Sequence, residues 1–118
     1  DPRVNIRYLC AQKGQGKSIK SFDKRIKKKL PKISDIKKAD LNNVDLLFLS
    51  LPNGEAQKMI NTLYFKFLHL RFIDLSADFR LENFNKYKIW YNKNHKAKKL
   101  IKSSLYSISE FNKRKIKN

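Results

Sequence analysis

Cysteine is nearly absent from this sequence, and long apolar segments are absent altogether. With one cysteine among 118 residues, Cys10, the chain cannot form an internal disulfide, which fits a reducing compartment. No run approaches the roughly 18 apolar residues that a transmembrane helix needs. No positively charged segment followed by an apolar one opens the chain, as it would in a signal peptide. We therefore expect a cytoplasmic protein that makes no contact with a membrane.

Acidic residues are scarce, with 10 Asp and Glu against 28 Lys and Arg, and the net charge is +18. Such an excess is typical of nucleic-acid-binding proteins, because Lys and Arg neutralise phosphates and release counterions. However, the basic residues are mostly Lys spread along the chain, and the aromatic residues lie in segments with apolar periodicity. Lys, Asn and Ile are abundant together, a bias expected of AT-rich coding sequence. We therefore do not expect a nucleic-acid partner, and a small basic nucleic-acid-binding module is kept as the alternative from another class.

Apolar periodicity predicts a folded α/β domain, since hydrophobic residues make up 41% of the chain and aromatic residues 12%. An apolar run at residues 44–52, closed by a proline, is typical of a parallel strand covered on both faces. A helix is predicted to begin near Ala56, with one apolar face, and to end near Leu68 or His69. The next strand is predicted at residues 72–75. Strand, helix and strand then form a parallel unit with a right-handed crossover.

The flanking segments show weaker patterns. Residues 4–10 alternate and then become apolar, which indicates a strand ending at Cys10. Cys10 is interpreted as a small apolar side chain and not as a nucleophile. Residues 19–40 are rich in Lys and irregular in apolar spacing, so we expect a long basic connection with at most a short helix. Aromatic residues at helical spacing in residues 84–91 predict a short amphipathic helix, after which His95 is expected to be exposed among lysines.

Three polar residues directly follow the strand predicted at residues 72–75. Ser76, Asp78 and Arg80 lie at its carboxyl end, where open α/β sheets build their binding sites. Arg80 can hold a carboxylate or a phosphate through two parallel hydrogen bonds, with Asp78 orienting it. The alternative is a structural turn, in which the Ser and Asp side chains cap the next backbone amides. The spacing alone does not separate the two interpretations.

Glycine is sparse as well, and two of the three glycines lie in the loop after residues 4–10. The Gly-x-Gly-Lys-Ser series that begins at Gly14 is not a P-loop, because that motif needs a further glycine where Ala11 or Gln12 stands. In a dinucleotide-binding fold, the loop after the second strand can place a cation near the ribose 2′-phosphate of the cofactor. Residues 11–18 would be that loop in this chain. A solvated basic loop is the alternative.

Residues 75–81, Leu-Ser-Ala-Asp-Phe-Arg-Leu, resemble a signature of the N-acetyl-gamma-glutamyl-phosphate reductases, enzymes of arginine biosynthesis. Residues 44–54 are similar to the preceding strand of that family and its Leu-Pro-x-Gly turn, and residues 84–95 to its Trp-Tyr…His segment. Residues 105–112 are similar to a later Tyr-Gly-Leu-Pro-Glu-Leu-Asn segment, with a matching Glu110. The resemblance covers essentially the whole chain and is stronger in its second half.

The resemblance implies an incomplete Rossmann-type (doubly wound) parallel sheet domain that spans residues 1–118. The first strand, glycine-rich turn and first helix of the family are missing, and so is the Asn-Pro-Gly-Cys stretch that carries its nucleophile. No catalytic residue and no metal ligand is therefore assigned to this chain. We expect the fragment to be inactive and to bind NADP weakly or not at all. Another semialdehyde dehydrogenase, such as the aspartate-semialdehyde enzyme, is the alternative within the fold, which the Ser-Ala-Asp-Phe-Arg stretch disfavours.

For the whole enzyme, the resemblance implies NADPH-dependent reduction of N-acetyl-glutamyl 5-phosphate, in which a Cys thiolate displaces phosphate and hydride reduces the thioester. It implies NADP in preference to NAD, a small-molecule substrate and a homo-oligomer. Ser76, Asp78 and Arg80 are expected to line the cleft between cofactor and substrate. The expected cofactor-binding residues lie in two turns and comprise Lys13, Gly16, Lys17, Leu51, Pro52 and Gly54.

Overall fold

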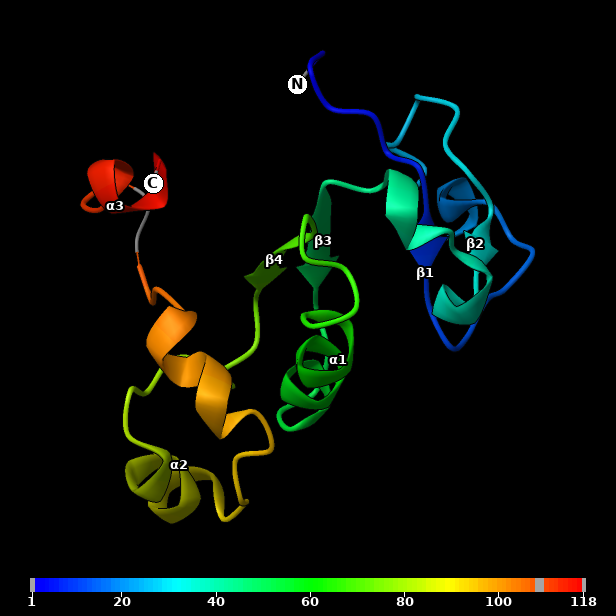
Figure 1. Cartoon of the computed structure of the whole chain (residues 1–118). Coiled ribbons are helices and arrows are strands. Elements are labelled where there is room, and N and C mark those ends of the chain that lie inside the picture. Colours follow the sequence, from blue (N-terminus) through cyan, green and yellow to red (C-terminus); the bar gives the residue numbers. More distant parts are fainter. Residues whose placement is uncertain (1, 108–109, 118) are drawn as a thin grey trace. The chain divides into compact units, whose positions relative to one another are not determined.

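The computed structural model describes residues 2–107 and 110–117. The chain divides into two compact units, Asp1–Val44 and Asp45–Asn118, and each unit has its own pair of parallel strands (Figure 1). The sequence predicted one domain or part of one. No helix in the described part of the chain is long and apolar enough to cross a membrane.

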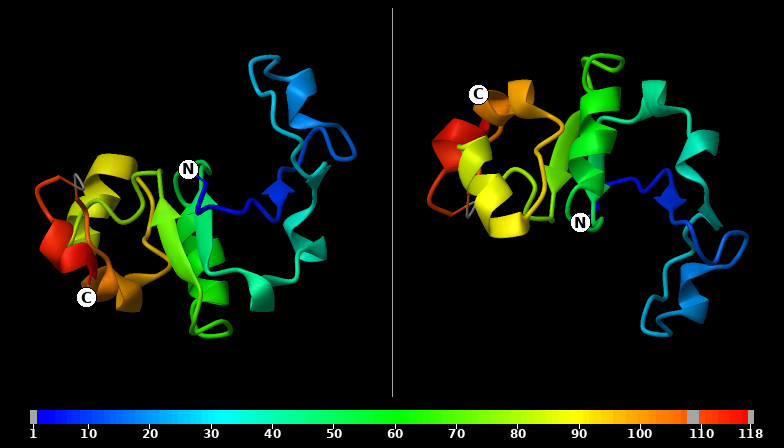
Figure 2. Two further views of the ribbon diagram at one scale, coloured as in Figure 1. Left: turned by 90° about the horizontal axis from the view of Figure 1, so that it is seen from above. Right: turned by 90° about the horizontal axis from the view of Figure 1, so that it is seen from below.

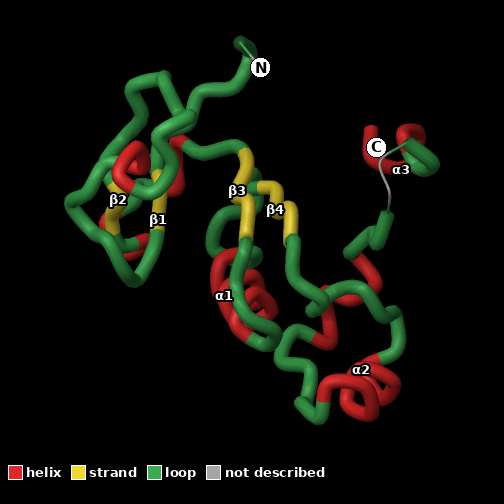
Figure 3. Tube along the Cα trace, turned by 180° about the vertical axis from the view of Figure 1, so that it is seen from behind, coloured by secondary structure: helices red, strands yellow, loops and turns green. Residues whose placement is uncertain are grey.

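The first unit consists mainly of loops around a very short strand pair (Figure 3). Strand β1, Leu9–Cys10, pairs in parallel with β2, Ile33–Ser34. The strand predicted at residues 4–10 is wrong before Leu9, because residues 4–8 have no partner strand in the described part of the chain. The predicted basic connection, residues 19–40, contains two 3-10 helices, η1 (Ile19–Ser21) and η2 (Ile36–Lys38), and also strand β2, which was not predicted. A further 3-10 helix, η3 (Leu41–Asn43), follows it.

The second unit contains the predicted strand–helix–strand arrangement. Strand β3, Leu46–Leu49, is followed by helix α1, Glu55–Leu63, and then by strand β4, Arg71–Asp74. The two strands pair in parallel, with Leu49 opposite Asp74. Strand β3 is shorter than the predicted run at residues 44–52, whereas β4 has the predicted four residues but begins and ends one residue earlier than predicted. The register places the carboxyl ends of the strands, and hence the turns that follow them, next to each other.

Helix α1 lies along one face of the β3–β4 pair (Figure 2). The alternation of side chains along β3 divides its residues between the two faces. Leu49 is buried against Ile60 of α1, whereas Phe48 points away and is 61% exposed. The prediction that both faces are covered is therefore wrong within this unit. The buried core comprises Leu49, Ala56, Ile60, Ala97 and Leu100.

Helix α1 ends at Leu63, earlier than the predicted end near Leu68 or His69. The backbone tightens there, since the amide of Lys66 donates to the carbonyl of Leu63 at 3.1 Å. Leu68 is 83% exposed, so no core contact continues the helix. His69 lies in a turn before β4, and its φ is not positive. Among the described non-glycine residues, positive φ occurs at Asn92.

Helix α2, Phe84–Tyr91, forms over the residues predicted. The side chain of Asn83 caps its N-terminus, and Asn92 ends it in the left-handed conformation. Its amphipathic character is weaker than predicted, because Tyr87 is fully buried while Trp90 is 76% exposed. The later elements are η4 (Lys98–Ser103) and α3 (Lys113–Lys117).

Candidate functional site

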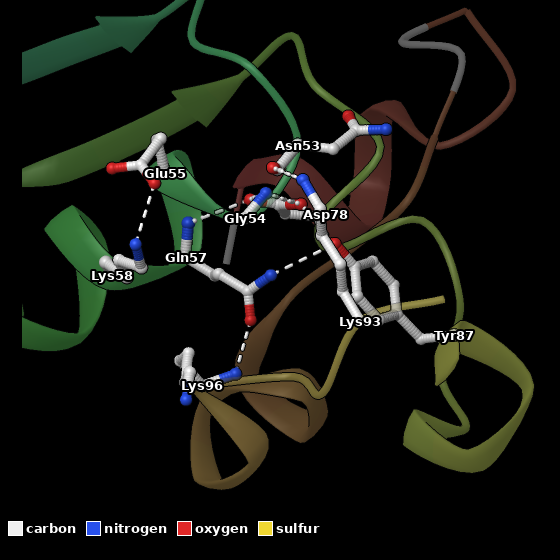
Figure 4. Close-up of polar contacts among 9 residues, drawn as sticks. All are labelled: Asn53, Gly54, Glu55, Gln57, Lys58, Asp78, Tyr87, Lys93 and Lys96. Carbon is white, nitrogen blue, oxygen red and sulfur yellow. Dashed lines mark hydrogen bonds and ion pairs between the residues drawn. The ribbon is translucent and has the colours of Figure 1, made fainter. Parts of the chain in front are cut away.

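The carboxylate of Asp78 is the centre of a buried hydrogen-bond network at the N-terminus of α1 (Figure 4). Its oxygens accept from the backbone amide of Gly54 at 2.8 and 2.9 Å and from that of Gln57 at 3.0 Å. The hydroxyl of Tyr87 donates to it at 2.6 Å. Negative charge is favourable here, because the first amides of a helix lack intrahelical acceptors and the helix dipole is positive at this end.

Gly54 explains why a carboxylate from a distant segment occupies this position. It is the N-cap of α1, has a φ of 94° and has no side chain with which to cap the helix. Most N-caps supply the oxygen of a Ser, Thr, Asp or Asn side chain to these amides. Asp78, 24 residues further along the chain, supplies it instead. The turn after β3 and the turn after β4 are therefore fixed to each other.

Gln57 and Tyr87 extend the network to the later part of the unit. Gln57 Nε2 donates to the Tyr87 hydroxyl at 3.0 Å, and Gln57 Oε1 accepts from the amide of Lys96. Burial, and then the hydrogen bond to Asp78, raises the pKa of Tyr87 well above its ordinary value, so the phenol stays protonated and donates. In the described part of the chain, every buried side-chain nitrogen and oxygen has a partner. The network is therefore complete within the unit.

His95 is buried, so the prediction that it is exposed is wrong; the side chain is 3% exposed. Its Nε2 lies 2.8 Å from the carbonyl oxygen of Asp78, and its Nδ1 accepts from the amide of Ala97 at 3.1 Å. These contacts select the neutral ring with the hydrogen on Nε2. The lysines beside it in the sequence suggested solvent, whereas its ring packs edge-on against Phe79 and Tyr87.

The stability of the chain should depend on pH through His95. Burial lowers the pKa of His95 below its ordinary value of 6.5. Because the unfolded chain then binds the proton more tightly, stability should be highest above that value and decrease as the pH falls through it. We expect His95→Gln to remove this slope and the exposed His69→Gln to keep it. Urea unfolding followed by circular dichroism between about pH 5 and pH 7.5 measures the slope, and equal slopes in both variants would contradict the assignment.

Ser76 forms a structural turn at the end of β4. Its amide and its hydroxyl donate to the two carboxylate oxygens of Asp74, each at 2.9 Å, and its hydroxyl accepts from the amide of Asp78 at 3.1 Å. The side chain of Asn53 accepts from the amide of Ala77 at 3.4 Å and adds a second link to the turn after β3. This geometry is that of a structural turn, the alternative in which the Ser and Asp side chains cap the next backbone amides. The sequence reasoning did not assign Asp74, although its position directly before the signature was a usable signal.

Arg80 lies apart from Asp78, and the prediction that Asp78 orients it is wrong. Asp78 is fully buried and its carboxylate bonds to two backbone amides and to Tyr87. Arg80 is exposed, and its guanidinium lies over the ring of Tyr106, 5.5 Å from the ring centroid. Guanidinium groups stack favourably on aromatic faces in this way. Arg80 is therefore open to a ligand, whereas Asp78 acts on the backbone.

The turn after β3 holds three of the predicted cofactor-binding residues. Leu51 packs against the core, Pro52 is exposed, and the amide of Gly54 is already bonded within the network. Lys93 donates from Nζ to the carbonyl of Asn53 at 2.9 Å, which places a cation over this turn. The groups left open to a ligand are therefore the outer surface of the turn and the Lys93 side chain.

The other predicted cofactor-binding residues lie in the first unit. The amide of Gly16 donates to the carbonyl of Ile33 at 2.8 Å, and the carbonyl of Lys17 accepts from the amide of Ile33 at 3.0 Å. These backbone groups are bonded to Ile33 of β2 and do not hold a phosphate. The side chains of Lys13 and Lys17 are exposed. Cys10, interpreted as a small apolar side chain at the end of a strand, does end β1, but it is exposed. Partial desolvation raises the pKa of its thiol, which disfavours a nucleophilic role.

The second unit thus brings Leu51, Pro52 and Gly54 next to Ser76 and Asp78 at the carboxyl ends of two parallel strands. Ligands of open α/β sheets bind at such ends. No group of His, Cys, Asp and Glu within residues 2–107 and 110–117 is arranged to hold a metal ion.

The amino-acid sequence is similar to those of known proteins over the whole chain. The family model described as "Semialdehyde dehydrogenase, NAD binding domain" matches residues 1–118. A probable chloroplastic N-acetyl-gamma-glutamyl-phosphate reductase of Oryza sativa subsp. japonica is 36% identical over 118 residues, which is 99% of this chain and 28% of the relative. The corresponding Arabidopsis thaliana protein is 36% identical over 98% of this chain and 28% of its own length.

A bacterial relative shows the same relation. The N-acetyl-gamma-glutamyl-phosphate reductase of Brachyspira hyodysenteriae is 34% identical over 123 residues, 98% of this chain and 34% of the relative. The chain therefore spans about a third of the length of the curated relatives it matches. With parallel strands joined through a helix, and a family match over its whole length, the chain belongs to the semialdehyde dehydrogenase NAD-binding domain family.

Proposed function

We propose that this chain is the cofactor-binding part of an NADP-dependent N-acetyl-gamma-glutamyl-phosphate reductase of arginine biosynthesis. The names of its plant and bacterial relatives support this. The observation that carries the proposal is the folding of the signature at residues 75–81, which forms a turn at a strand carboxyl end and is tied to the neighbouring Pro-Asn-Gly turn. We include in the proposal an incomplete doubly wound domain over residues 1–118, a cytoplasmic location and a homo-oligomeric enzyme.

Taken separately, the exposed residues of each unit suit one end of a nicotinamide cofactor better than its pyrophosphate. The N-terminus of α1 does not suit a pyrophosphate, because the buried carboxylate of Asp78 already occupies it and would repel the added charge. Lys13 and Lys17 are exposed cations that suit a ribose 2′-phosphate, which favours NADP over NAD. The outer surface at Pro52 would contact the nicotinamide half.

In the proposed reaction the substrate is N-acetyl-glutamyl 5-phosphate, and the bound cofactor supplies the hydride. The contribution of this chain is to hold the turns after β3 and β4 in position. The Asp78 network fixes the two turns against each other, so that the Pro52 surface and the segment leading to Arg80 keep a constant separation. We assign no nucleophile for the thioester step to this chain. Partial burial raises the pKa of its single cysteine, Cys10, which disfavours the reactive thiolate.

The 118-residue chain by itself is expected to show no turnover. We would supply the semialdehyde product, phosphate and NADP, and follow the formation of NADPH. The full-length Brachyspira hyodysenteriae reductase under the same conditions is the positive control. Turnover by the isolated chain above the buffer rate would show that a nucleophile is present in it, and would contradict the assignment of this chain to cofactor binding and positioning.

A segment exchange tests the proposed function directly. The aligned segment of the Brachyspira hyodysenteriae reductase would be replaced by this chain, and the hybrid assayed for NADPH formation from the semialdehyde. We expect measurable activity, because the exchanged segment supplies the same turns to the same cofactor. Deletion of the segment is the negative control. A hybrid that folds and assembles like the parent enzyme but gives no activity would overturn the proposal.

A further inference from the structure

The turn between β3 and α1 contains a dipeptide with a chemistry of its own. Of the three glycines in the sequence, Gly54 is the one that follows an asparagine, Asn53. Asparagine is among the chemically labile residues of proteins. A following glycine increases this lability, because it has no side chain to shield its amide nitrogen from the carbonyl carbon of the asparagine side chain. Asn53 is half-buried and follows the exposed Pro52, so water reaches the turn.

The reaction open to this dipeptide is a hydrolysis of the asparagine side chain. The Gly54 amide first gives up its proton to solvent, which makes its nitrogen a nucleophile. That nitrogen bonds to Cγ of Asn53, and the side-chain nitrogen takes up a proton and leaves as ammonia. Water then opens the resulting cyclic imide at either carbonyl and leaves aspartate or isoaspartate at position 53. Water is the co-reactant, and nothing is oxidised or reduced.

Asp78 opposes the first step of this reaction in the folded chain. Its carboxylate oxygens accept from the Gly54 amide at 2.8 and 2.9 Å in a fully buried position. Loss of the amide proton would break this bond and place a second negative charge beside the carboxylate, which is costly where water is excluded. The side chain of Asn53 is held as well, because its oxygen accepts from the amide of Ala77 at 3.4 Å. Both reacting groups are therefore restrained.

Lys93 favours the same step. Its ammonium donates to the backbone carbonyl of Asn53 at 2.9 Å (Figure 4). This carbonyl belongs to the peptide group that contains the Gly54 nitrogen, and the charge left behind by the amide proton is shared with the carbonyl oxygen. A cation on that oxygen stabilises the charge as it develops. Asp78 and Lys93 therefore act in opposite directions on one peptide group.

We propose that Asn53 is a site of spontaneous deamidation, which Asp78 suppresses in the folded chain and which Lys93 promotes whenever the contact between Asp78 and Gly54 opens. Isoaspartate at this position inserts a methylene group into the backbone of the turn, and either product adds a carboxylate near that of Asp78. Both changes disturb the alignment of the turns after β3 and β4. The proposal does not depend on the reductase activity.

The test is incubation of the 118-residue chain in mildly alkaline buffer, with and without guanidinium chloride. Mass spectrometry that locates the change to residue 53 gives the rate of deamidation, and a protein isoaspartyl methyltransferase assay detects isoaspartate. We expect deamidation at Asn53 to be at least about tenfold slower in the folded chain than in the unfolded one, as the strength of a buried hydrogen bond to a charged group implies. Equal rates in the two states would overturn the proposal.

Two variants separate the specific contact of Asp78 from general destabilisation. Asp78→Ala should raise the rate in buffer about tenfold beyond the rate that its measured unfolded fraction predicts. Tyr87→Phe keeps the contact between Gly54 and Asp78, so it should deamidate no faster than its own unfolded fraction predicts. A rate in Asp78→Ala that its unfolded fraction explains in full would overturn the protective role of the carboxylate.

Lys93→Ala tests the opposite influence and does not endanger the fold, because Lys93 is exposed. It should lower the rate in buffer about twofold to fivefold, as expected for one exposed charge, and leave the rate in guanidinium chloride unchanged. Lys88→Ala, which removes an exposed lysine from α2, is the matched control and should keep the original rate. Equal rates in the two lysine variants in buffer would overturn the role of Lys93, whether or not Asp78→Ala folds.

Discussion

Replacing Asp78 by asparagine is expected to lower the free energy of unfolding by about 3 kcal/mol, because hydrogen bonds to a buried charged group are worth more than neutral ones. The carboxylate accepts from two backbone amides and from Tyr87 in a fully buried position. An asparagine keeps the shape but turns an NH₂ group toward these donors. Asp78→Ala leaves all the donors without an acceptor, and its cost should reach about 3–5 kcal/mol.

The matched control for this prediction is Asp45→Asn. Asp45 is an exposed carboxylate of the same unit, and surface changes of this kind cost at most about 0.5 kcal/mol. Urea unfolding at neutral pH, followed by circular dichroism, measures both variants. If the two variants unfold at the same urea concentration, the carboxylate of Asp78 does not cap α1. In that case it does not link the turns after β3 and β4 either.

The sequence predicted the elements whose signal is local. Apolar spacing predicted α1 between two parallel strands, and aromatic spacing predicted Phe84–Tyr91 as α2. These patterns reflect how each segment buries its own side chains. The predicted ends of these helices and strands were less accurate. Helix α1 stops at Leu63 because the apolar pattern continues into residues that the core does not reach, such as Leu68, which is 83% exposed.

The contacts of the polar residues could not be predicted from spacing. Asp78 and Arg80 lie two residues apart in the signature, yet Asp78 is buried at the N-terminus of α1 and Arg80 is exposed over Tyr106. The difference depends on partners far along the chain, since the amide that Asp78 caps lies 24 residues away and the carbonyl that His95 contacts lies 17 residues away. A neutral buried histidine among lysines has no local signature, and the resemblance of residues 84–95 to the family was the one pointer to it.

Tyr87→Phe is the second change with a large expected effect. The hydroxyl donates to Asp78 and accepts from Gln57, and the ring is fully buried. Phenylalanine fills the same volume, so packing is kept while both hydrogen bonds are lost. The Gln57 amide and one lone pair of the carboxylate then lack partners. We expect a loss of about 2 kcal/mol in the free energy of unfolding.

Tyr91→Phe is the control for the loss of a phenol. Tyr91 lies on the same helix with its ring centroid 4.8 Å from that of Tyr87, and its hydroxyl makes no hydrogen bond within the described part of the chain. Its removal should change stability by less than about 0.5 kcal/mol. Equal effects of the two phenylalanine variants would show that Tyr87 acts through its ring alone.

A double-mutant cycle with Asp78→Asn separates the hydrogen bond from general destabilisation. If the Tyr87 hydroxyl stabilises the chain mainly through Asp78, the two losses should fall short of additivity by about 1 kcal/mol or more. Because Tyr87 also accepts from Gln57, part of its effect should survive in the Asp78→Asn background. Full additivity would mean that the two side chains act independently. The helix cap would then be held by Asp78 alone, and α2 would contribute nothing to the alignment of the turns after β3 and β4.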